Sequence, residues 1–300
     1  MAHVKVQIFG KLHLQNGDTR LEHFPTRRVE ELLGYLLINQ KTQIPRDKLV
    51  EVLWPDSSPS NGRASLSTAL WRLKSVFAQI DAAAQDYISS SRDSISFAPE
   101  KPFTFDLVEY RRYLDKAETA KSKKGRLEAL QSAVAIYKGG FCEGIYSEWC
   151  LAERERLERS YLRSLGSLMS IHISRGEHQL AIPHGKKILR IDPLREEVHR
   201  AMMRCYLALN RRVEAMRQFQ SCARLLQREL NILPMAKTID LFRRVVDERV
   251  EARSSNGSLP AAYQNRLNQA YESFLSAADE LNDLIEEGSR VQEPEPSKQP

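Results

Sequence analysis

In the first hundred residues the spacing of apolar positions changes from every second residue, typical of strands, to about every 3.6 residues, typical of helices, and then back. Apolar side chains take alternate positions from Val4 to Leu14, and the following Asn16-Gly17-Asp18 favours a tight turn, which predicts a small N-terminal sheet. From Thr26 the apolar positions follow helical spacing, and three helices are expected, at about residues 26–39, 44–53 and 63–77. Two short β-rich runs, one on each side of Ser91-Arg92-Asp93, predict a closing hairpin. This order of elements is typical of a winged helix-turn-helix.

The third predicted helix separates a buried stripe from an outer face. Large apolar residues fall within one narrow arc: Leu66, Leu70, Leu73 and Phe77. The opposite side carries small or hydroxyl side chains and one indole: Ala64, Thr68, Trp71 and Ser75. Residues 61–79 contain three cations, Arg63, Arg72 and Lys74, and no acidic residue. A helix that lies against phosphates cannot carry carboxylates on its outer face, so this face is predicted to bind DNA. The alternative is an ordinary solvated face that lacks acids.

Residues 105–250 carry helical signals throughout. Within them two segments align at an offset of 34 residues, which pairs Ala181 with Ala215 and Ile188 with Cys222. A helix-turn-helix period of this length is typical of tetratricopeptide repeats. The predicted fold is therefore an α+β winged helix-turn-helix followed by an all-α, tetratricopeptide-like repeat domain. The expected boundaries are 1–100 for the winged helix, 104–250 for the repeat domain, 251–259 for a linker, 260–288 for an amphipathic acidic helix and 289–300 for a disordered tail.

The charge is distributed unevenly along the chain. The net charge of +6 divides into +1 for residues 1–100, with 12 basic against 11 acidic side chains, +10 for residues 101–250 and −5 for residues 251–300. A basic middle region suits a nucleic-acid partner, but helices rich in Arg and Glu often carry such an excess without any partner. The charge alone therefore does not decide the function.

The sequence lacks the motifs that carry common enzyme chemistry. It contains no phosphate-binding loop, dinucleotide fingerprint, zinc-protease motif or nucleophile elbow. His172, His178 and His184 are six residues apart, a spacing that does not gather imidazoles on one helical face, and the four cysteines lack CxxC spacing. No apolar run reaches the ~18 residues of a membrane span, and the N-terminus has no secretory signal. We expect a cytoplasmic protein that is not an enzyme and binds no metal or cofactor.

Several runs of residues resemble a known family. The sequences RRVEELLGYLLINQ, IPRDKLVEVLWPD and RASLSTALWRLKSVF resemble the winged-helix domain of the SARP (antibiotic regulatory protein) transcriptional activators. The run DPLREEVHRAMMRCYLALNRRVEAMRQFQSCARLLQRELNI resembles the bacterial transcriptional activator domain that follows it in that family, so the resemblance covers about residues 4–250. It implies a bacterial, nucleoid-associated protein that binds repeated promoter elements as head-to-tail protomers and recruits RNA polymerase. It also implies a polymerase contact in the loop from Trp54 to Gly62, which includes Asp56.

Together these patterns predict a sequence-specific, DNA-binding transcriptional regulator that acts as an activator. The expected partners are double-stranded promoter DNA, RNA polymerase and, on DNA, a second copy of the chain. The candidate DNA contacts are Thr68 and Arg72 on bases, Trp71 on a thymine methyl or sugar, Arg63 and Lys74 on phosphates, and Arg92 in the hairpin. The alternative is a tetratricopeptide-type adaptor whose N-terminal domain no longer binds DNA, because a net charge of +1 is weak for phosphate neutralisation.

Overall fold

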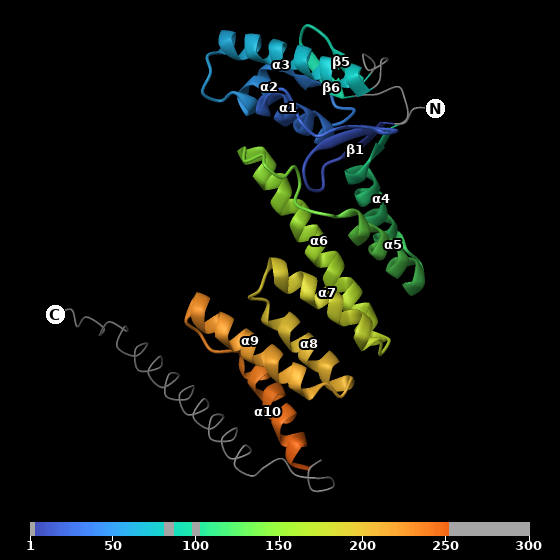
Figure 1. Ribbon diagram of the computed structural model, residues 1–300, viewed down its shortest axis with the longest axis vertical. Helices are drawn as coiled ribbons and strands as arrows, with labels where there is room; N and C mark the ends of the chain where they lie inside the picture. Colours follow the sequence, from blue (N-terminus) through green and yellow to red (C-terminus); the bar gives the residue numbers. More distant parts are fainter. Residues whose placement is uncertain (1–3, 81–86, 98–102, 252–300) are drawn as a thin grey trace, which may run out of the picture. The chain divides into compact units, whose positions relative to one another are not determined.

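The computed structural model describes residues 4–80, 87–97 and 103–251. The chain divides into two compact units, Met1–Glu177 and His178–Pro300, and each unit is described by itself (Figure 1). The predicted C-terminal helix and tail, and all of the predicted linker except Glu251, lie outside the described residues.

The N-terminal sheet contains one strand that the sequence analysis did not predict. Its strands are β1 (Val4–Gln7), β2 (His13–Asn16), β3 (Thr19–Leu21) and β7 (Phe103–Phe105), in the order β3-β2-β1-β7. The first three are antiparallel neighbours, as their alternating pattern indicated. The fourth, β7, runs parallel to β1, with Val4 opposite Phe103. Three residues are too few to show a period, and the partner strand lies about a hundred residues earlier in the chain.

Three helices follow the first hairpin, as expected. They are α1 (Arg27–Ile38), α2 (Arg46–Leu53) and α3 (Pro59–Ile80). The predicted start of the third helix near Arg63 was wrong: the helix begins at Pro59, since proline is well accepted in a first helical turn. Gly62 lies against α2, and a Cβ atom built on it would come within 2.3 Å of Val50 Cγ1. The close approach of α2 and α3 therefore depends on glycine at this position.

The wing is a three-stranded sheet in the order β4-β6-β5. Its strands are β4 (Ile44–Pro45), β5 (Ile88–Ser90) and β6 (Ser94–Phe97). Ile44 and Pro45, which were expected to begin the second helix, instead pair with Ile95 and Ser94. Arg46 then fixes the tip of the hairpin, because its backbone N–H donates to the Asp93 carbonyl at 2.9 Å and its Nε to the Ser91 carbonyl at 3.0 Å.

Three further helices complete the first unit: α4 (Asp106–Thr119), α5 (Lys123–Ile136) and α6 (Glu148–Ser174). Asp106 Oδ2 accepts hydrogen bonds from the backbone N–H groups of Ile8 (3.0 Å) and Phe9 (3.1 Å). Burial raises the pKa of this carboxyl, while these hydrogen bonds oppose the rise. These bonds link the start of α4 to the residues that follow β1, and the compact unit accordingly continues to Glu177. The domain boundary expected at residues 100–104 remains a prediction.

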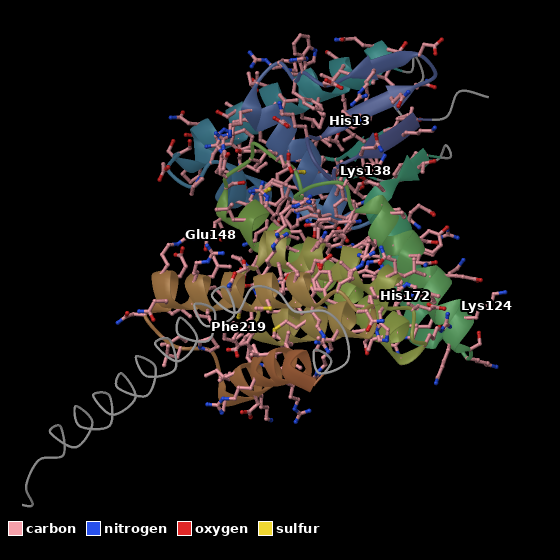
Figure 2. The ribbon with its side chains drawn as sticks, turned by 60° about the horizontal axis from the view of Figure 1, so that its bottom comes forward. His13, Lys124, Lys138, Glu148, His172 and Phe219 are labelled. Carbon is pink, nitrogen blue, oxygen red and sulfur yellow. The ribbon has the colours of Figure 1, made fainter. Side chains whose placement is uncertain are left out.

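The second unit contains α7 (His178–Ile191), α8 (Glu196–Ala208), α9 (Arg212–Leu230) and α10 (Ala236–Glu251). The small residues that the 34-residue offset pairs, Ala181 and Ala215, are both fully buried. Phe219 of α9 is labelled in Figure 2. Its ring stacks on that of Phe242 of α10, with ring centroids 4.0 Å apart. The chain therefore has the predicted fold class, a winged helix-turn-helix followed by a tetratricopeptide-like helical region.

Candidate nucleic-acid interface

The outer face of α3 is exposed, and its inner stripe is buried. All four predicted core residues of this helix, Leu66, Leu70, Leu73 and Phe77, are buried. On the other side, Ala64 and Thr68 are exposed, and the Trp71 side chain is 69% exposed. No other large apolar side chain in the described part of the chain is exposed to that extent. An indole on open surface costs solvation free energy unless a partner covers it.

The hydroxyl side chains of this face bond to their own helix. Ser67, Thr68 and Ser75 each donate to the carbonyl four residues earlier, at distances of 2.9, 3.1 and 3.1 Å. These bonds hold the side chains close to the backbone and leave each hydroxyl oxygen able to accept a hydrogen bond. Apart from the Trp71 indole, the side chains of this face are therefore short and held against the helix, and residues 61–79 contain no acid.

The four candidate cations differ in their surroundings. Arg63 makes two hydrogen bonds with Asp47 of α2, Nε to Oδ1 at 2.9 Å and Nη2 to Oδ2 at 3.0 Å, and this pairing lowers the pKa of the Asp47 carboxyl. Lys74 donates to Ser90 Oγ of the wing at 3.1 Å. Arg72 and Arg92 make no hydrogen bond or ion pair with any other residue that the structure describes. Neither the Asp47 partner of Arg63 nor the Ser90 partner of Lys74 follows from the sequence pattern.

A groove of about 380 Å³ lies between the start of α1, the end of α2 and the outer face of α3. Its lining residues are Thr26, Arg28, Trp54, Ala64, Ser65, Thr68, Ala69 and Arg72. The groove brings the candidate residues Thr68, Arg72 and Trp54 together with Thr26 and Arg28, which the sequence analysis did not assign to the interface. The sequence feature that could have indicated this part of the interface is the pair Arg27-Arg28, which directly follows the helix N-cap Thr26.

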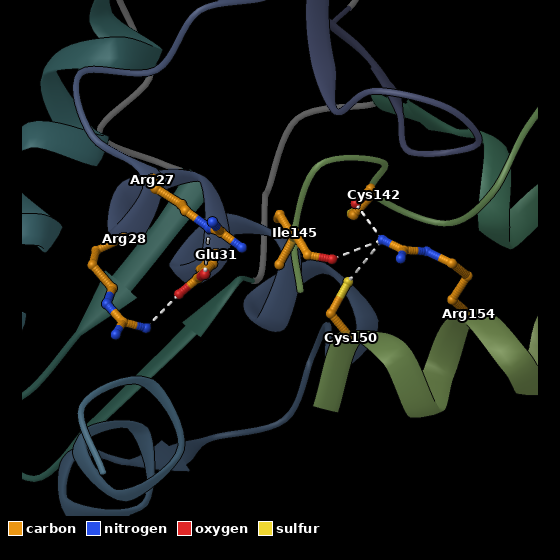
Figure 3. Close-up of polar contacts among 7 residues, drawn as sticks. All are labelled: Arg27, Arg28, Glu31, Cys142, Ile145, Cys150 and Arg154. Carbon is orange, nitrogen blue, oxygen red and sulfur yellow. Dashed lines mark hydrogen bonds and ion pairs between the residues drawn. The ribbon is translucent and has the colours of Figure 1, made fainter. Parts of the chain in front are cut away.

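A buried carboxylate holds this arginine doublet. Glu31 is only 3% exposed and accepts hydrogen bonds from Arg27 Nε at 3.2 Å and from Arg28 Nη1 at 2.6 Å (Figure 3). The Arg27 guanidinium also lies over the ring of Tyr146, 5.5 Å from its centroid. The two adjacent arginines therefore share one acidic partner, but of the two only Arg28 lines the groove.

The loop between α2 and α3 is shorter than expected. Trp54 ends α2, with its backbone N–H donating to the Val50 carbonyl at 2.8 Å, and α3 begins at Pro59. Asp56 is exposed at the surface of this loop, whereas Trp54 is half-buried and lines the groove. The role of both residues in contacting polymerase stays a prediction.

A second polar cluster stabilises the loop before α6. Arg154 donates to the carbonyls of Cys142 and Ile145, both at 2.8 Å, and its Nη2 lies 3.8 Å from Cys150 Sγ (Figure 3). Its Nε also donates to the Phe141 carbonyl at 2.9 Å. These hydrogen bonds hold residues 141–145 against the first turns of α6.

The described residues contain no group of His, Cys, Asp and Glu side chains that could hold a metal ion. In the same part of the chain, no helix is long and apolar enough to cross a membrane.

Comparison with known proteins relates the chain to bacterial transcriptional regulators. Residues 105–246 match the family model of the bacterial transcriptional activator domain. The chain is 23% identical over 235 residues to the regulatory protein AfsR of Streptomyces coelicolor, which covers 77% of this chain and 23% of AfsR. It is 22% identical over 273 residues to the transcriptional regulatory protein MoaR1 of Mycobacterium tuberculosis, which covers 85% of this chain and 87% of that protein. The chain spans about a quarter of the length of its AfsR relatives.

A solved structure supports the same fold. Mycobacterium tuberculosis EmbR, in complex with a low-affinity phosphopeptide, matches with a TM-score of 0.64 and 16% sequence identity over 92% of this chain and 72% of that chain. Residues 105–246 therefore match a bacterial transcriptional activator domain, and the chain is similar to bacterial transcriptional regulators. The matches to the AfsR proteins agree with the resemblance to SARP-type regulators that the sequence runs predicted.

Proposed function

We propose that this regulator binds specific double-stranded promoter DNA through the outer face of α3. The observation that carries the proposal is the exposed Trp71 on an acid-free helical face, with Arg72 next to it and without a partner among the described residues. A recognition helix of this kind enters the major groove, where an arginine can bond to guanine and an apolar group can contact the thymine methyl. In the proposal Thr68 and Arg72 contact bases and Trp71 contacts a thymine methyl or sugar.

Three features of the wing and its surroundings support additional backbone contacts. Arg92 lies at the exposed tip of the hairpin, and Lys74 is held beside the wing by Ser90. Arg63 is paired with an exposed carboxylate, and a DNA phosphate can replace that partner because both side chains are open to solvent. We assign these three cations to phosphates.

The proposed outcome of DNA binding is activation of transcription in the bacterial cytoplasm. Protomers would occupy repeated promoter elements head to tail, and the loop with Trp54 and Asp56 would contact RNA polymerase. The SARP-type domain order supports this reading of the chain. The proposal includes no catalytic step.

DNA selection tests the proposal. The full chain is used to select duplexes from a random pool, and its Kd for a selected and a scrambled duplex is measured by fluorescence anisotropy at several salt concentrations. Trp71→Ala should make the free energy of binding to the selected duplex less favourable by about 1 to 3 kcal/mol, which is measured as a higher Kd. Tyr146→Ala is the matched control, since Tyr146 is also exposed (67%) and aromatic but does not lie on α3. Equal effects of the two changes would contradict the assignment of α3.

The adaptor function is the second candidate. It is favoured by the pairing of Arg63 with Asp47 and of Lys74 with Ser90, which leaves fewer cations available for phosphates. Binding that is absent or insensitive to salt in the same experiment would support the adaptor, because phosphate neutralisation makes DNA affinity strongly dependent on salt.

A further inference from the structure

We propose that the groove between α1 and α3 is a binding site for a phosphodiester group of the DNA backbone, with Arg28 as the residue that binds the phosphate and Glu31 as the residue that positions it. The proposal rests on the proposed DNA-binding function and adds a contact from α1, a helix to which the sequence analysis gave no role in binding.

The composition of the groove suits an anion. None of the eight described residues that line it is acidic, and two of them, Arg28 and Arg72, are cationic. Thr26 adds a hydroxyl donor from the start of α1, whereas the Thr68 hydroxyl already donates to the Ala64 carbonyl of its own helix. Glu30, the other acid in this turn of α1, does not line the groove. A phosphate oxygen that enters the groove therefore meets hydrogen-bond donors and no repelling carboxylate.

The position of the groove favours the DNA backbone over a base. Thr68 and Arg72 lie both in this groove and on the face assigned to base readout. When a recognition helix occupies the major groove, helices beside it cross the flanking backbone. The α1 wall, with Arg28, is therefore placed where a phosphate next to the contacted bases would lie. The planar fork of arginine bonds to phosphate with more than one N–H group, which makes it well suited to this role.

The hydrogen bond to Glu31 can fix the Arg28 side chain before DNA binds. The carboxylate bonds to a single guanidinium nitrogen of Arg28, Nη1 at 2.6 Å, so the remaining N–H groups stay available to a ligand. A long arginine side chain loses rotamer freedom when it binds, and a buried partner that fixes it beforehand reduces that loss. Burial of a carboxylate is costly unless it is paired, and its two arginine partners meet that condition (Figure 3).

Arg27 and Arg28 provide a matched pair of variants. They are adjacent, both bond to Glu31, and replacement of either by Ala removes one positive charge, but of the two only Arg28 lines the groove. With the selected duplex, Arg28→Ala should weaken binding about tenfold. It should also reduce the slope of log K against log salt by about 0.9, because one phosphate contact is lost. Arg27→Ala should change affinity less than twofold and leave the slope unchanged.

The role of Glu31 is tested with a double-mutant cycle. Glu31→Gln should weaken binding about threefold in the wild-type chain and cause no loss in the Arg28→Ala chain, because it acts only through Arg28. A purely structural role would weaken binding in both backgrounds, and simple repulsion between Glu31 and DNA would make Glu31→Gln bind more tightly. Either result would overturn the positioning role.

The outcomes separate this proposal from the function on which it rests. If the chain binds DNA and Arg28→Ala behaves like Arg27→Ala or like the wild type, the groove assignment is overturned and the proposed function stands. If the full chain binds no selected duplex, both are overturned. A loss specific to Arg28, with a reduced salt slope, supports the groove as a phosphate site.

Discussion

The outer face of α3 and the junction between α8 and α10 use arginine in opposite ways. On α3, Arg72 has no hydrogen-bond or ion-pair partner among the described residues. At the junction, Arg200 is only 15% exposed and donates from Nη1 to Glu196 Oε1 at 3.1 Å and to Thr238 Oγ1 at 2.9 Å. Both arginines lie on amphipathic helices, so the sequence pattern does not distinguish them. The difference shows that part of a basic excess can serve internal hydrogen bonds, so the net charge of a region does not measure its capacity to bind nucleic acid.

Glu196 is the centre of the junction. Its Oε1 also accepts hydrogen bonds from the backbone N–H of Met235, at 2.8 Å, and from the Thr238 hydroxyl. These bonds join the first turn of α8 to the start of α10, and Thr238 is fully buried. Arg200 therefore contributes to the stability of the second unit.

A change at Glu196 tests this internal role. Glu196→Gln leaves the half-buried Arg200 without its charged partner and should lower the free energy of unfolding by about 3 kcal/mol. Glu197→Gln, at the exposed neighbouring position, should change it by less than about 0.5 kcal/mol. Urea unfolding of the full chain, followed by circular dichroism, measures both variants. Equal midpoints would mean that the junction is not a stabilising site.

Leu70→Ala tests the inner side of α3. It empties a position on the buried stripe and should destabilise the protein by about 2 to 5 kcal/mol. The exposed Thr68→Ala serves as the control and should have little effect on stability. If the Leu70 variant melted like the wild type, the assignment of inner and outer faces would be reversed, and the DNA face with it.

Ala181 and Ala215 test the repeat that underlies the second unit. Both are fully buried at equivalent positions of α7 and α9. A leucine at either site should force the packed helices apart and cost about 1 to 3 kcal/mol. Ala181→Leu and Ala215→Leu should therefore lower the urea midpoint by similar amounts. Tolerance of leucine at both sites would show that the 34-residue alignment is accidental.

Arg72 and Lys74 test the two kinds of DNA contact proposed for α3, one with a base and one with a phosphate. Arg72→Ala should leave the unfolding midpoint unchanged and reduce the preference at one base position by about 1 to 3 kcal/mol. Lys74→Ala should lower affinity for all sequences and reduce the salt slope by about one unit. Both are measured against duplexes with single base changes. If Arg72→Ala weakened binding to every duplex equally, Arg72 would be a phosphate contact and not a base contact.

Local signals were sufficient for the helices and for the orientation of α3. The burial of Leu66 and Phe77 and the exposure of Trp71 follow from the helical period alone, because an amphipathic helix can bury only one side. Local signals failed at Pro59 and Ile44. The first was assigned to a loop rich in Ser and Pro, and the second to a helix, although its pairing with Ile95 makes it a strand.

The sequence alone indicated the helices, their buried faces and the resemblance to a family, since each depends on residues close together in the chain. Only the tertiary structure placed β7 beside β1, paired Arg63 with Asp47 and formed the groove in which Arg28 and Arg72 lie on facing helices. These features join residues that are 16 to about 100 positions apart. Hydrophobic period reports which side of an element is buried, but it carries no information about which distant element will cover that side or pair with a given charge.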